Sequence, residues 1–390
     1  MRVTFVLPFT SLDGGSRVVA IYADRLSRRG HDVTVVSCGR RPIALKYRIK
    51  DAVLRATHGQ FRAPPTPTHF DAFPHLHKRI PGPGPVTARD VPDADVIVAT
   101  WWETAEWVAR MPASKGRKVH LIQHDERIFT DDPDTRARTA ATWSLPDFSR
   151  IVVAGWLQEL GQREFGVETT LINNAVDTDL FNAPPRQRNE KPTFGLMYHP
   201  REFKGADISV RAFELARERI PGIRLKAFGP EGEFERIPLP PGTPLQVQPP
   251  QREIASFYAS CDAYLFGSRC EGFGLPILEA MACRTPVIGT PTGAAPELIA
   301  EGGGRLVRME DPESMTEAIV EIASMSPEAW RRMSDAAWET AQKHCWDRAT
   351  DQFEVTLAEA CGAPRDTARL QASMEAPAGS AKGAAVVAGT

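Results

Sequence analysis

The sequence predicts an α/β protein with two doubly wound, parallel-sheet domains of the Rossmann type. The sequence begins with an apolar strand (2–7), which is followed by the loop TSLDGGS. A helical pattern then ends at Gly30, and a second strand (31–37) follows it. This order is a βαβ unit, which implies parallel strands joined by a right-handed crossover. The same alternation begins again at residue 193, and a length of 390 residues is too great for one ordinary core.

Each further element is predicted from its apolar periodicity. In the first half, we expect strands at 96–100, 119–123 and 151–154. In the second half, we expect strands at 193–198, 225–228 and 263–266, and helices at 208–219 and 346–360.

The polar, proline-containing run APPRQRNEKP follows INNAVDTDLF and marks the expected domain boundary. We therefore expect a first domain at 1–175 with a basic and proline-rich insertion near 40–92, a second domain at 186–345, a helix at 346–362 that packs back on the first domain, and a disordered tail at 363–390. The tail is expected to be disordered because its Ala, Gly, Ser and Thr residues bury little apolar surface.

The composition excludes several classes of protein. A net charge of −2 provides no overall field to attract nucleic acid. Six scattered cysteines without a CxxC pair fit a reducing cytoplasm. No window approaches the roughly 20 apolar residues of a membrane span, and residues 1–9 are too short an apolar run for a signal peptide. We therefore expect a soluble, cytoplasmic protein.

The segment 40–62 interleaves seven cations with apolar residues. One interpretation is a solvated, partly helical insertion. The other is a peripheral anchor on an anionic membrane, which would place the protein at the inner face of that membrane. The proline-rich stretch that follows, to about residue 92, predicts long ordered loops with few strands.

The densest motif is SRCEGFGLPILEAMAC at 268–283. Gly272 and Gly274 allow the backbone to bend close to a ligand, and Pro276 suits the first turn of a helix. The N–H groups of that helix start would bind an anion such as a diphosphate. Glu271 and Glu279, the latter placed in the first helical turn, would accept hydrogen bonds from hydroxyls on either side. A nucleotide sugar has this layout of ribose, diphosphate and sugar. The alternative is that Glu279 only favours the helix dipole and the glycines only form a turn.

With the following text, EAMACRTPVIGTPTGAAPELI, the motif resembles the E-x7-E signature of retaining GT-B glycosyltransferases (family 4-like, glycosyl transferases group 1). The GT-B fold has two Rossmann-like domains that face each other across a cleft. The resemblance implies that Glu271 contacts hydroxyls of the donor sugar and that Glu279 holds the ribose. It also implies that the backbone of Gly272, Phe273, Gly274 and Leu275 meets the sugar and phosphate. Arg284 departs from the family, which usually has glycine there.

The block TFGLMYHPREFKGAD resembles the basic loop of the same family, in which an Arg and a Lys neutralise the diphosphate. The lysine here is Lys204, but the expected arginine position holds His199. We expect Arg201, two residues later, to supply the missing guanidinium. Fixed cations are needed because departure of a nucleoside diphosphate builds up negative charge.

The first domain is expected to hold the acceptor and the remaining site residues. Gly14 and Gly15 look like the glycine loop of the family, although a glycine pair can also be a simple turn. His124 follows a strand and is the candidate catalytic histidine near the transferred sugar; a structural histidine is the alternative. Trp101 and Trp102 end another strand, where they line the acceptor site or pack a domain face.

The resemblance implies a retaining hexosyl- or deoxyhexosyltransferase in glycan, glycolipid or glycosylated natural-product biosynthesis. Its partners would be a nucleotide-sugar donor and a glycan, lipid-linked or small-molecule acceptor, without nucleic acid. No cofactor and no metal is expected, because the DxD-like pairs 93/95, 132/134 and 177/179 occur at the frequency of chance. The alternatives are a nucleotide-sugar epimerase or hydrolase on the same fold, and a non-catalytic nucleotide-sugar-binding protein.

Overall fold

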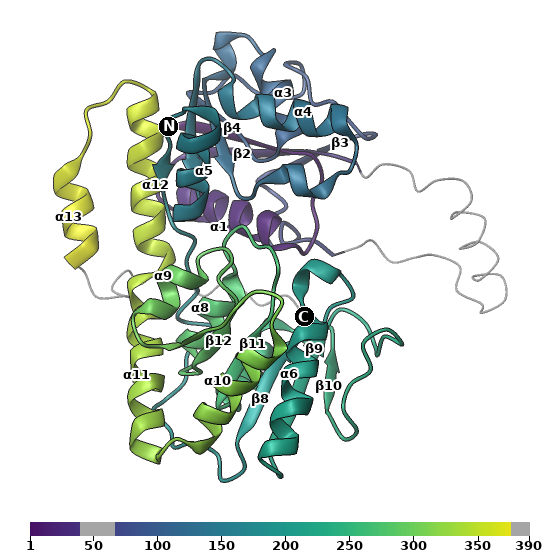
Figure 1. Ribbon diagram of the computed structural model, residues 1–390. Coiled ribbons are helices and arrows are strands. Elements are labelled where there is room, and N and C mark those ends of the chain that lie inside the picture. The colour runs from purple at the N-terminus through teal and green to yellow at the C-terminus, as the bar shows by residue number, and fades with distance from the viewer. Residues whose placement is uncertain (40–66, 376–390) are drawn as a thin grey trace. The chain divides into compact units, whose positions relative to one another are not determined.

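The computed structural model describes residues 1–39 and 67–375, so the basic segment 40–62 lies outside the described residues. The chain forms two compact units (Figure 1). Among the described residues, unit 1 comprises 1–39, 67–152, 158–171 and 352–366, and unit 2 comprises 153–157, 172–351 and 367–375.

Unit 1 has a parallel sheet of seven strands in the order β3-β2-β1-β4-β5-β6-β7. The strands are β1 Arg2–Leu7, β2 Asp32–Cys38, β3 His77–Ile80, β4 Val96–Ala99, β5 Arg117–Ile122, β6 Phe148–Val152 and β7 Thr170–Leu171. The helices are α1 Gly14–Arg28, α3 Trp102–Ala109, α4 Pro133–Ala141 and α5 Gly155–Phe165, whose first three residues belong to unit 2, with 3-10 turns η1 Ala113–Lys115, η2 Glu126–Phe129 and η3 Thr142–Ser144. All four residues of β4 are buried, as expected for a parallel strand covered on both faces.

Unit 2 has a parallel sheet of six strands in the order β10-β9-β8-β11-β12-β13. The strands are β8 Thr193–Met197, β9 Arg224–Gly229, β10 Leu245–Val247, β11 Ala263–Phe266, β12 Val287–Gly289 and β13 Gly304–Leu306. The helices are η4 Glu202–Lys204, α6 Ala206–Arg219, α7 Gln251–Ala259, α8 Leu275–Ala282, α9 Ala295–Ala300, α10 Pro312–Ser324, α11 Pro327–Lys343, α12 Trp346–Ala360 and α13 Thr367–Glu375. The two sheets confirm the predicted α/β class with two parallel-sheet domains.

The proline-rich stretch, predicted to have few strands, contains the short strand β3, which joins the edge of the sheet beside β2 although its two central residues are exposed cations. One expectation about an irregular segment was wrong. The tail beyond residue 363, expected to be disordered, contains the helix α13, whose Arg369 lies 3.3 Å from Asp351. Ala, Gln, Met and Leu in that helix are strong helix formers, and this local preference outweighs the lack of bulky residues.

The long helix α12 begins in unit 2 and ends in unit 1. Its Phe353 is fully buried, and the ring stacks on Tyr22 at 4.2 Å and on Phe5 at 6.1 Å. The end of the helix therefore contributes to the aromatic core of unit 1.

Each sheet has a switch point between two adjacent strands. On one side of this point the strands that follow in the chain are added in one direction, and on the other side they are added in the opposite direction. In unit 1 this point lies between β1 and β4, and in unit 2 it lies between β8 and β11. Ligands of open α/β sheets bind beyond the carboxyl ends of the strands at such points. The loops that follow these four strands are therefore the places to look for a site.

Arg284, at the position where the resemblance has glycine, adopts the left-handed conformation with φ of 58°. This backbone explains a preference for glycine, because a Cβ atom is strained there. The arginine has compensating contacts. Its Nε donates to the carbonyl of Ala183 at 3.0 Å, its guanidinium pairs with Asp335, and it lies 4.4 Å from the ring centroid of Trp338. The departure therefore concerns packing of unit 2.

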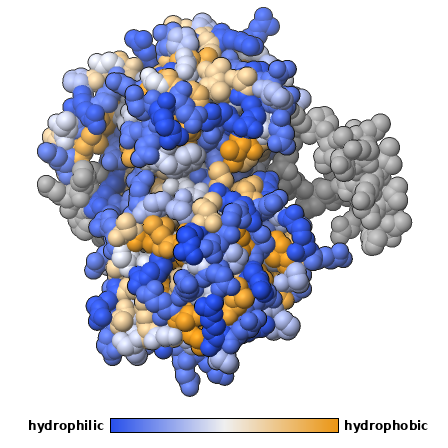
Figure 2. Space-filling view, in the orientation of Figure 1, coloured by the Kyte–Doolittle hydropathy of each residue, from blue (hydrophilic) through white to orange (hydrophobic). Residues whose placement is uncertain are grey.

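Apolar side chains reach the surface as separate patches among polar ones on the face shown in Figure 2. Within the described ranges, no helix is both long and apolar enough to cross a membrane.

Candidate active site

The loops after β8 and β11 meet at the switch point of unit 2 through two glycines. Gly205 adopts φ of 58°, and a Cβ added to it would lie 1.8 Å from the carbonyl oxygen of Gly267. A Cβ on Gly267 would in turn lie 2.5 Å from the carbonyl oxygen of Gly205. Only glycine allows this approach of the two backbones, which brings the preceding Lys204 to the loop that carries Glu271.

Lys204 and Glu271 form an ion pair at this point. Lys204 Nζ lies 2.7 Å from Glu271 Oε1, and Ser268 Oγ donates to the same oxygen at 2.8 Å. The backbone N–H of Glu271 donates to Thr292 Oγ1 at 3.0 Å. Glu271 is 8% exposed and therefore held in one orientation by buried neighbours. A cation and a fixed carboxylate thus stand together where a ligand is expected.

His199 and Arg201 lie on the same loop as Lys204. The backbone N–H of Arg201 donates to His199 Nδ1 at 3.1 Å, so this nitrogen is unprotonated and Nε2 carries the proton of the neutral ring. Burial, and then the charges of Lys204 and Arg201, lower the pKa of His199 to about 4. Arg201 is exposed, with its guanidinium carbon 5.8 Å from the ring centroid of Phe203. The loop therefore offers a lysine, an arginine and a neutral histidine.

The glycine motif turns the chain from β11 into α8. Gly274 precedes the helix with φ of 94°, and Pro276 lies in its first turn, as the sequence predicts. Trp156 Nε1 donates to the carbonyl of Gly272 at 2.8 Å. The backbone N–H of Ala294 donates to the carbonyl of Phe273 at 2.8 Å. These contacts hold residues 272–275 in place, so that the start of α8, with its partial positive charge, has a fixed direction.

Glu279 lies in the second turn of α8, and its expected place in the first turn was wrong. The reason is that the helix begins at Leu275, so Glu279 is its fifth residue. The side chain is buried, and the hydroxyl of Tyr258 donates to Glu279 Oε2 at 3.3 Å. Burial raises the pKa of the Tyr258 hydroxyl, which therefore stays protonated as a donor. A carboxylate in the second turn gains little from the helix dipole, which weakens that alternative.

The candidates from the first half of the chain lie in unit 1. Gly14 and Gly15 form the first turn of α1, directly after β1, and Gln123 Nε2 donates to the carbonyl of Gly15 at 3.4 Å. His124 follows β5, and its ring lies 5.0 Å from Phe129 in an edge contact. The carboxyl ends of β1 and β5 thus carry these residues, as predicted.

The two tryptophans after β4 have different environments. Trp102 is buried as the first residue of α3, with the guanidinium carbon of Arg138 5.0 Å from its ring centroid, so it packs the unit. Trp101 is half-buried, and its ring lies 5.7 Å from Phe129. The acceptor-lining role therefore suits Trp101 and not Trp102.

Sequence reasoning missed Glu126, a buried carboxyl two residues after His124. Its Oε2 accepts the backbone N–H of Trp102 at 2.6 Å, while Oε1 is buried without a hydrogen-bond partner in the described part of the chain. Burial raises the pKa of Glu126 well above its usual value, and the charges of Asp125 and Glu103 raise it further. The carboxyl therefore holds its proton more tightly than an exposed glutamate does, and it joins the loop after β5 to the start of α3.

Replacing Glu126 with glutamine is expected to stabilise the protein increasingly as pH rises. The folded protein binds this proton more tightly than the unfolded chain, whose carboxyl titrates near 4.5, so wild-type stability falls as pH rises from about 4.5 toward the folded pKa. Glutamine is neutral throughout, so the gain is about 1.4 kcal/mol for each unit by which the folded pKa exceeds 4.5. Urea unfolding at pH 4 and pH 7.5 measures it. An equal difference at both pH values would show that folding does not raise the pKa of Glu126.

The aspartate pairs singled out as possible metal motifs have structural partners. Asp93 pairs with Lys115, and Asp95 pairs with Arg2. Asp132 caps α4 by accepting the N–H of Thr135 at 2.9 Å. In the described residues, no group of three His, Cys, Asp or Glu side chains is placed to hold a metal ion.

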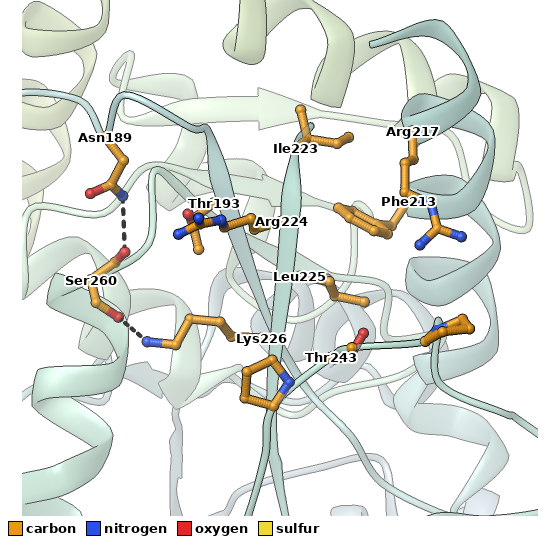
Figure 3. Close-up of a pocket in the computed structure, with 13 residues that line it drawn as sticks. Asn189, Thr193, Phe213, Arg217, Ile223, Arg224, Leu225, Lys226, Thr243 and Ser260 are labelled. Atoms are coloured by element: carbon orange, nitrogen blue, oxygen red, sulfur yellow. Dashed lines mark hydrogen bonds between the residues drawn. The ribbon is translucent and has the colours of Figure 1, made fainter. Parts of the chain in front are cut away.

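A cavity of about 590 Å³ in unit 2 lies at the opposite edge of the sheet (Figure 3). Thr193 and Arg224, the first residues of β8 and β9, line it together with Lys226. Lys226 Nζ donates to Ser260 Oγ at 2.6 Å, as the dashed line in Figure 3 shows. This cavity is at the amino ends of the strands, so it is separate from the Lys204–Glu271 site.

Comparison with known proteins gives a family match in unit 2 and several sequence relatives. Residues 193–325 match the family model of glycosyl transferases group 1. D-inositol 3-phosphate glycosyltransferase of Corynebacterium aurimucosum is 26% identical over 308 residues, which cover 69% of this chain and 72% of that protein. The protein of the same name from Saccharomonospora viridis is 34% identical over 182 residues, 42% of each chain.

Two solved structures share the fold. Sucrose-phosphate synthase from Thermosynechococcus elongatus superposes with a TM-score of 0.69 at 17% identity, over 93% of this chain and 100% of that one. The Anabaena protein HepE, solved in complex with UDP-glucose, also has a TM-score of 0.69 at 17% identity, over 92% of this chain and 100% of that one. The match to glycosyl transferases group 1 thus covers residues 193–325 of unit 2, and nearly the whole chain shares the two-domain fold of these two structures.

Proposed function

We propose that the protein transfers a sugar from a nucleotide-diphosphate sugar to an acceptor hydroxyl, with retention of the anomeric configuration. The observation that carries the proposal is the Lys204–Glu271 pair at the switch point of unit 2, beside the amino end of α8. One group suits a phosphate and the other suits sugar hydroxyls. The UDP-glucose bound to HepE supports this class of donor, and the sequence relatives are named as glycosyltransferases.

The donor is assigned to the residues of unit 2. Lys204 and Arg201 meet the diphosphate, together with the N–H groups of residues 272–275 at the start of α8. His199, neutral with a proton on Nε2, donates a hydrogen bond to a phosphate oxygen. Glu279 accepts from a ribose hydroxyl, and Glu271 accepts from a hydroxyl of the sugar.

Transfer breaks the bond between the anomeric carbon and the phosphate oxygen, and it forms a bond from the same carbon to the acceptor oxygen. The acceptor proton passes to the departing phosphate, and attack on the face that the phosphate leaves gives retention. Lys204 and the start of α8 stabilise the charge that builds on the leaving group. His124 in unit 1 is assigned to contact with the transferred sugar. The backbone of Gly14 and Gly15 is assigned to close approach to the donor.

We propose that these cations replace a metal ion, so that no metal or other cofactor is required. Lys204 Nζ, Arg201 and the amino end of α8 lie at one loop cluster, which supplies fixed positive charge for a diphosphate. The transferred group is assigned as a hexosyl or deoxyhexosyl unit, and the acceptor as part of a glycan, glycolipid or natural product. Two of the sequence relatives are named D-inositol 3-phosphate glycosyltransferase.

Calorimetric titration with UDP, dTDP, GDP and ADP tests the donor site and identifies the base. Lys204→Met is expected to weaken the preferred nucleoside diphosphate by at least about tenfold, because a charge-assisted phosphate contact contributes about 1.5–3 kcal/mol. Lys226→Met, a cation in the cavity at the opposite edge, is the matched control and should leave the affinity unchanged. Equal effects of both substitutions would contradict the assigned site.

Product analysis separates the remaining alternatives. NMR of the glycoside formed should give the donor's anomer, and the inverted anomer would overturn retention. Release of free or epimerised sugar from the donor alone, without transfer, would favour a hydrolase or epimerase. Nucleotide binding without any turnover of donor would favour a non-catalytic binding protein.

A further inference from the structure

The switch points of the two units differ in the large apolar side chains that they expose. In unit 2, the loops after β8 and β11 place Lys204 and Glu271 at this point. In unit 1, the loops after β1 and β5 carry charged residues such as Asp13 and Arg127, and beside them exposed aromatic and aliphatic side chains. Since the position in the fold is equivalent, the difference in lining indicates a ligand group of different chemistry.

The exposed large apolar side chains of unit 1 gather at this one edge of its sheet. In the described part of unit 1 they are Phe9, Leu12, Ile128 and Phe129, which are between 42% and 57% exposed. We call these four residues the apolar edge. Two of them follow β1 and two follow β5, and these strands flank β4, so the strand ends lie about 10 Å apart. Single exposed apolar residues are ordinary, whereas a group of them marks a binding surface.

One member of the apolar edge, Phe129, has fixed neighbours and contacts the candidate catalytic histidine. The ring of Phe129 contacts both Trp101, at 5.7 Å, and His124, at 5.0 Å. Glu126, in the same turn as Phe129, accepts the N–H of Trp102 at 2.6 Å and so fixes that turn against the start of α3. Such a prearranged aromatic surface binds apolar groups without the entropic cost of ordering it first.

We infer that the apolar edge of unit 1 binds an apolar part of the acceptor, so that the acceptor joins a hydroxyl-bearing head to a hydrophobic aglycone. The inference rests on the proposed transfer, because it places the acceptor in unit 1. The head lies toward His124 and Trp101, and the aglycone covers Phe9, Leu12, Ile128 and Phe129. Burial of aliphatic groups on these side chains favours binding by about fourfold for each methylene removed from water.

The test compares two probes with one head, methyl β-D-glucopyranoside and n-octyl β-D-glucopyranoside, the latter below its micelle concentration. Calorimetric titration of the full chain is expected to give a dissociation constant at least tenfold lower for the octyl compound. Leu12→Ser with Ile128→Ser should abolish most of this preference. Val247→Ser with Leu306→Ser is the matched control, because these side chains are similarly exposed but belong to unit 2, and it should keep the preference.

Equal binding of the two probes, or a preference that the control pair loses as much as the test pair, would overturn the inference. Sedimentation with anionic vesicles identifies the competing occupant. If Leu12→Ser with Ile128→Ser reduces vesicle binding and leaves the octyl preference intact, the surface binds membrane and not the acceptor. Titration of the same variants with UDP distinguishes failure of this inference from failure of the proposed function. A failure to bind any nucleoside diphosphate would count against the donor site and not against the apolar edge.

Discussion

Glu271→Gln is expected to lower kcat for sugar transfer by at least about 100-fold while changing the Kd of the nucleoside diphosphate less than threefold. Lys204 and Ser268 both donate to Glu271 Oε1, and we expect Oε2 to accept a hydroxyl of the donor sugar. Removing a prearranged, buried acceptor at a reacting centre costs about 100- to 1000-fold in rate. The nucleoside diphosphate has no sugar, so its affinity should be spared.

Glu202→Gln is the control for this substitution, because Glu202 is an exposed carboxylate on the loop that carries Lys204. Initial rates of donor turnover and titration with the diphosphate measure the two effects. A normal kcat in Glu271→Gln would contradict the assigned contact with the sugar. A parallel loss of diphosphate affinity would mean that Glu271 acts by holding Lys204 in position.

The regular elements were predictable because their apolar runs are long and buried. The strand at 263–266 and the helix at 346–360 have the predicted bounds, and β1 begins and ends as expected. The strand β3 was not predicted, because HKRI has only one buried residue. It becomes a strand by pairing with β2, and the local sequence pattern does not show that pairing. The fold class therefore depended on the central strands, whose sequences alone require burial on both faces.

The candidate site was predictable only where its chemistry is local in the sequence. Lys204 and Glu271 belong to motifs that the sequence displays, although their ion pair joins residues 67 positions apart. Glu126 follows His124 and Asp125 as one more acidic residue, and its role depends on the N–H of Trp102, 24 positions away. Its burial and raised pKa arise from that tertiary contact, which no spacing rule contains.

Gly205→Ala is expected to destabilise unit 2 by about 2–5 kcal/mol and to weaken nucleoside diphosphate binding by at least about tenfold. Two causes add. The residue has φ of 58°, where a Cβ costs about 1–2 kcal/mol, and the new Cβ would lie 1.8 Å from the carbonyl oxygen of Gly267. The backbones of the two loops must separate to relieve this clash, and Lys204 then moves away from Glu271.

Gly222→Ala separates the two causes, because it shares the left-handed backbone but not the clash. Gly222 has φ of 97° and lies just beyond the other end of α6, with no atom within 4 Å of an added Cβ. We expect urea unfolding to show a loss of about 1–2 kcal/mol in this variant and titration to show unchanged diphosphate affinity. Unchanged affinity in Gly205→Ala as well would mean that the loop tolerates separation, and the close approach of Gly205 and Gly267 would then serve stability only.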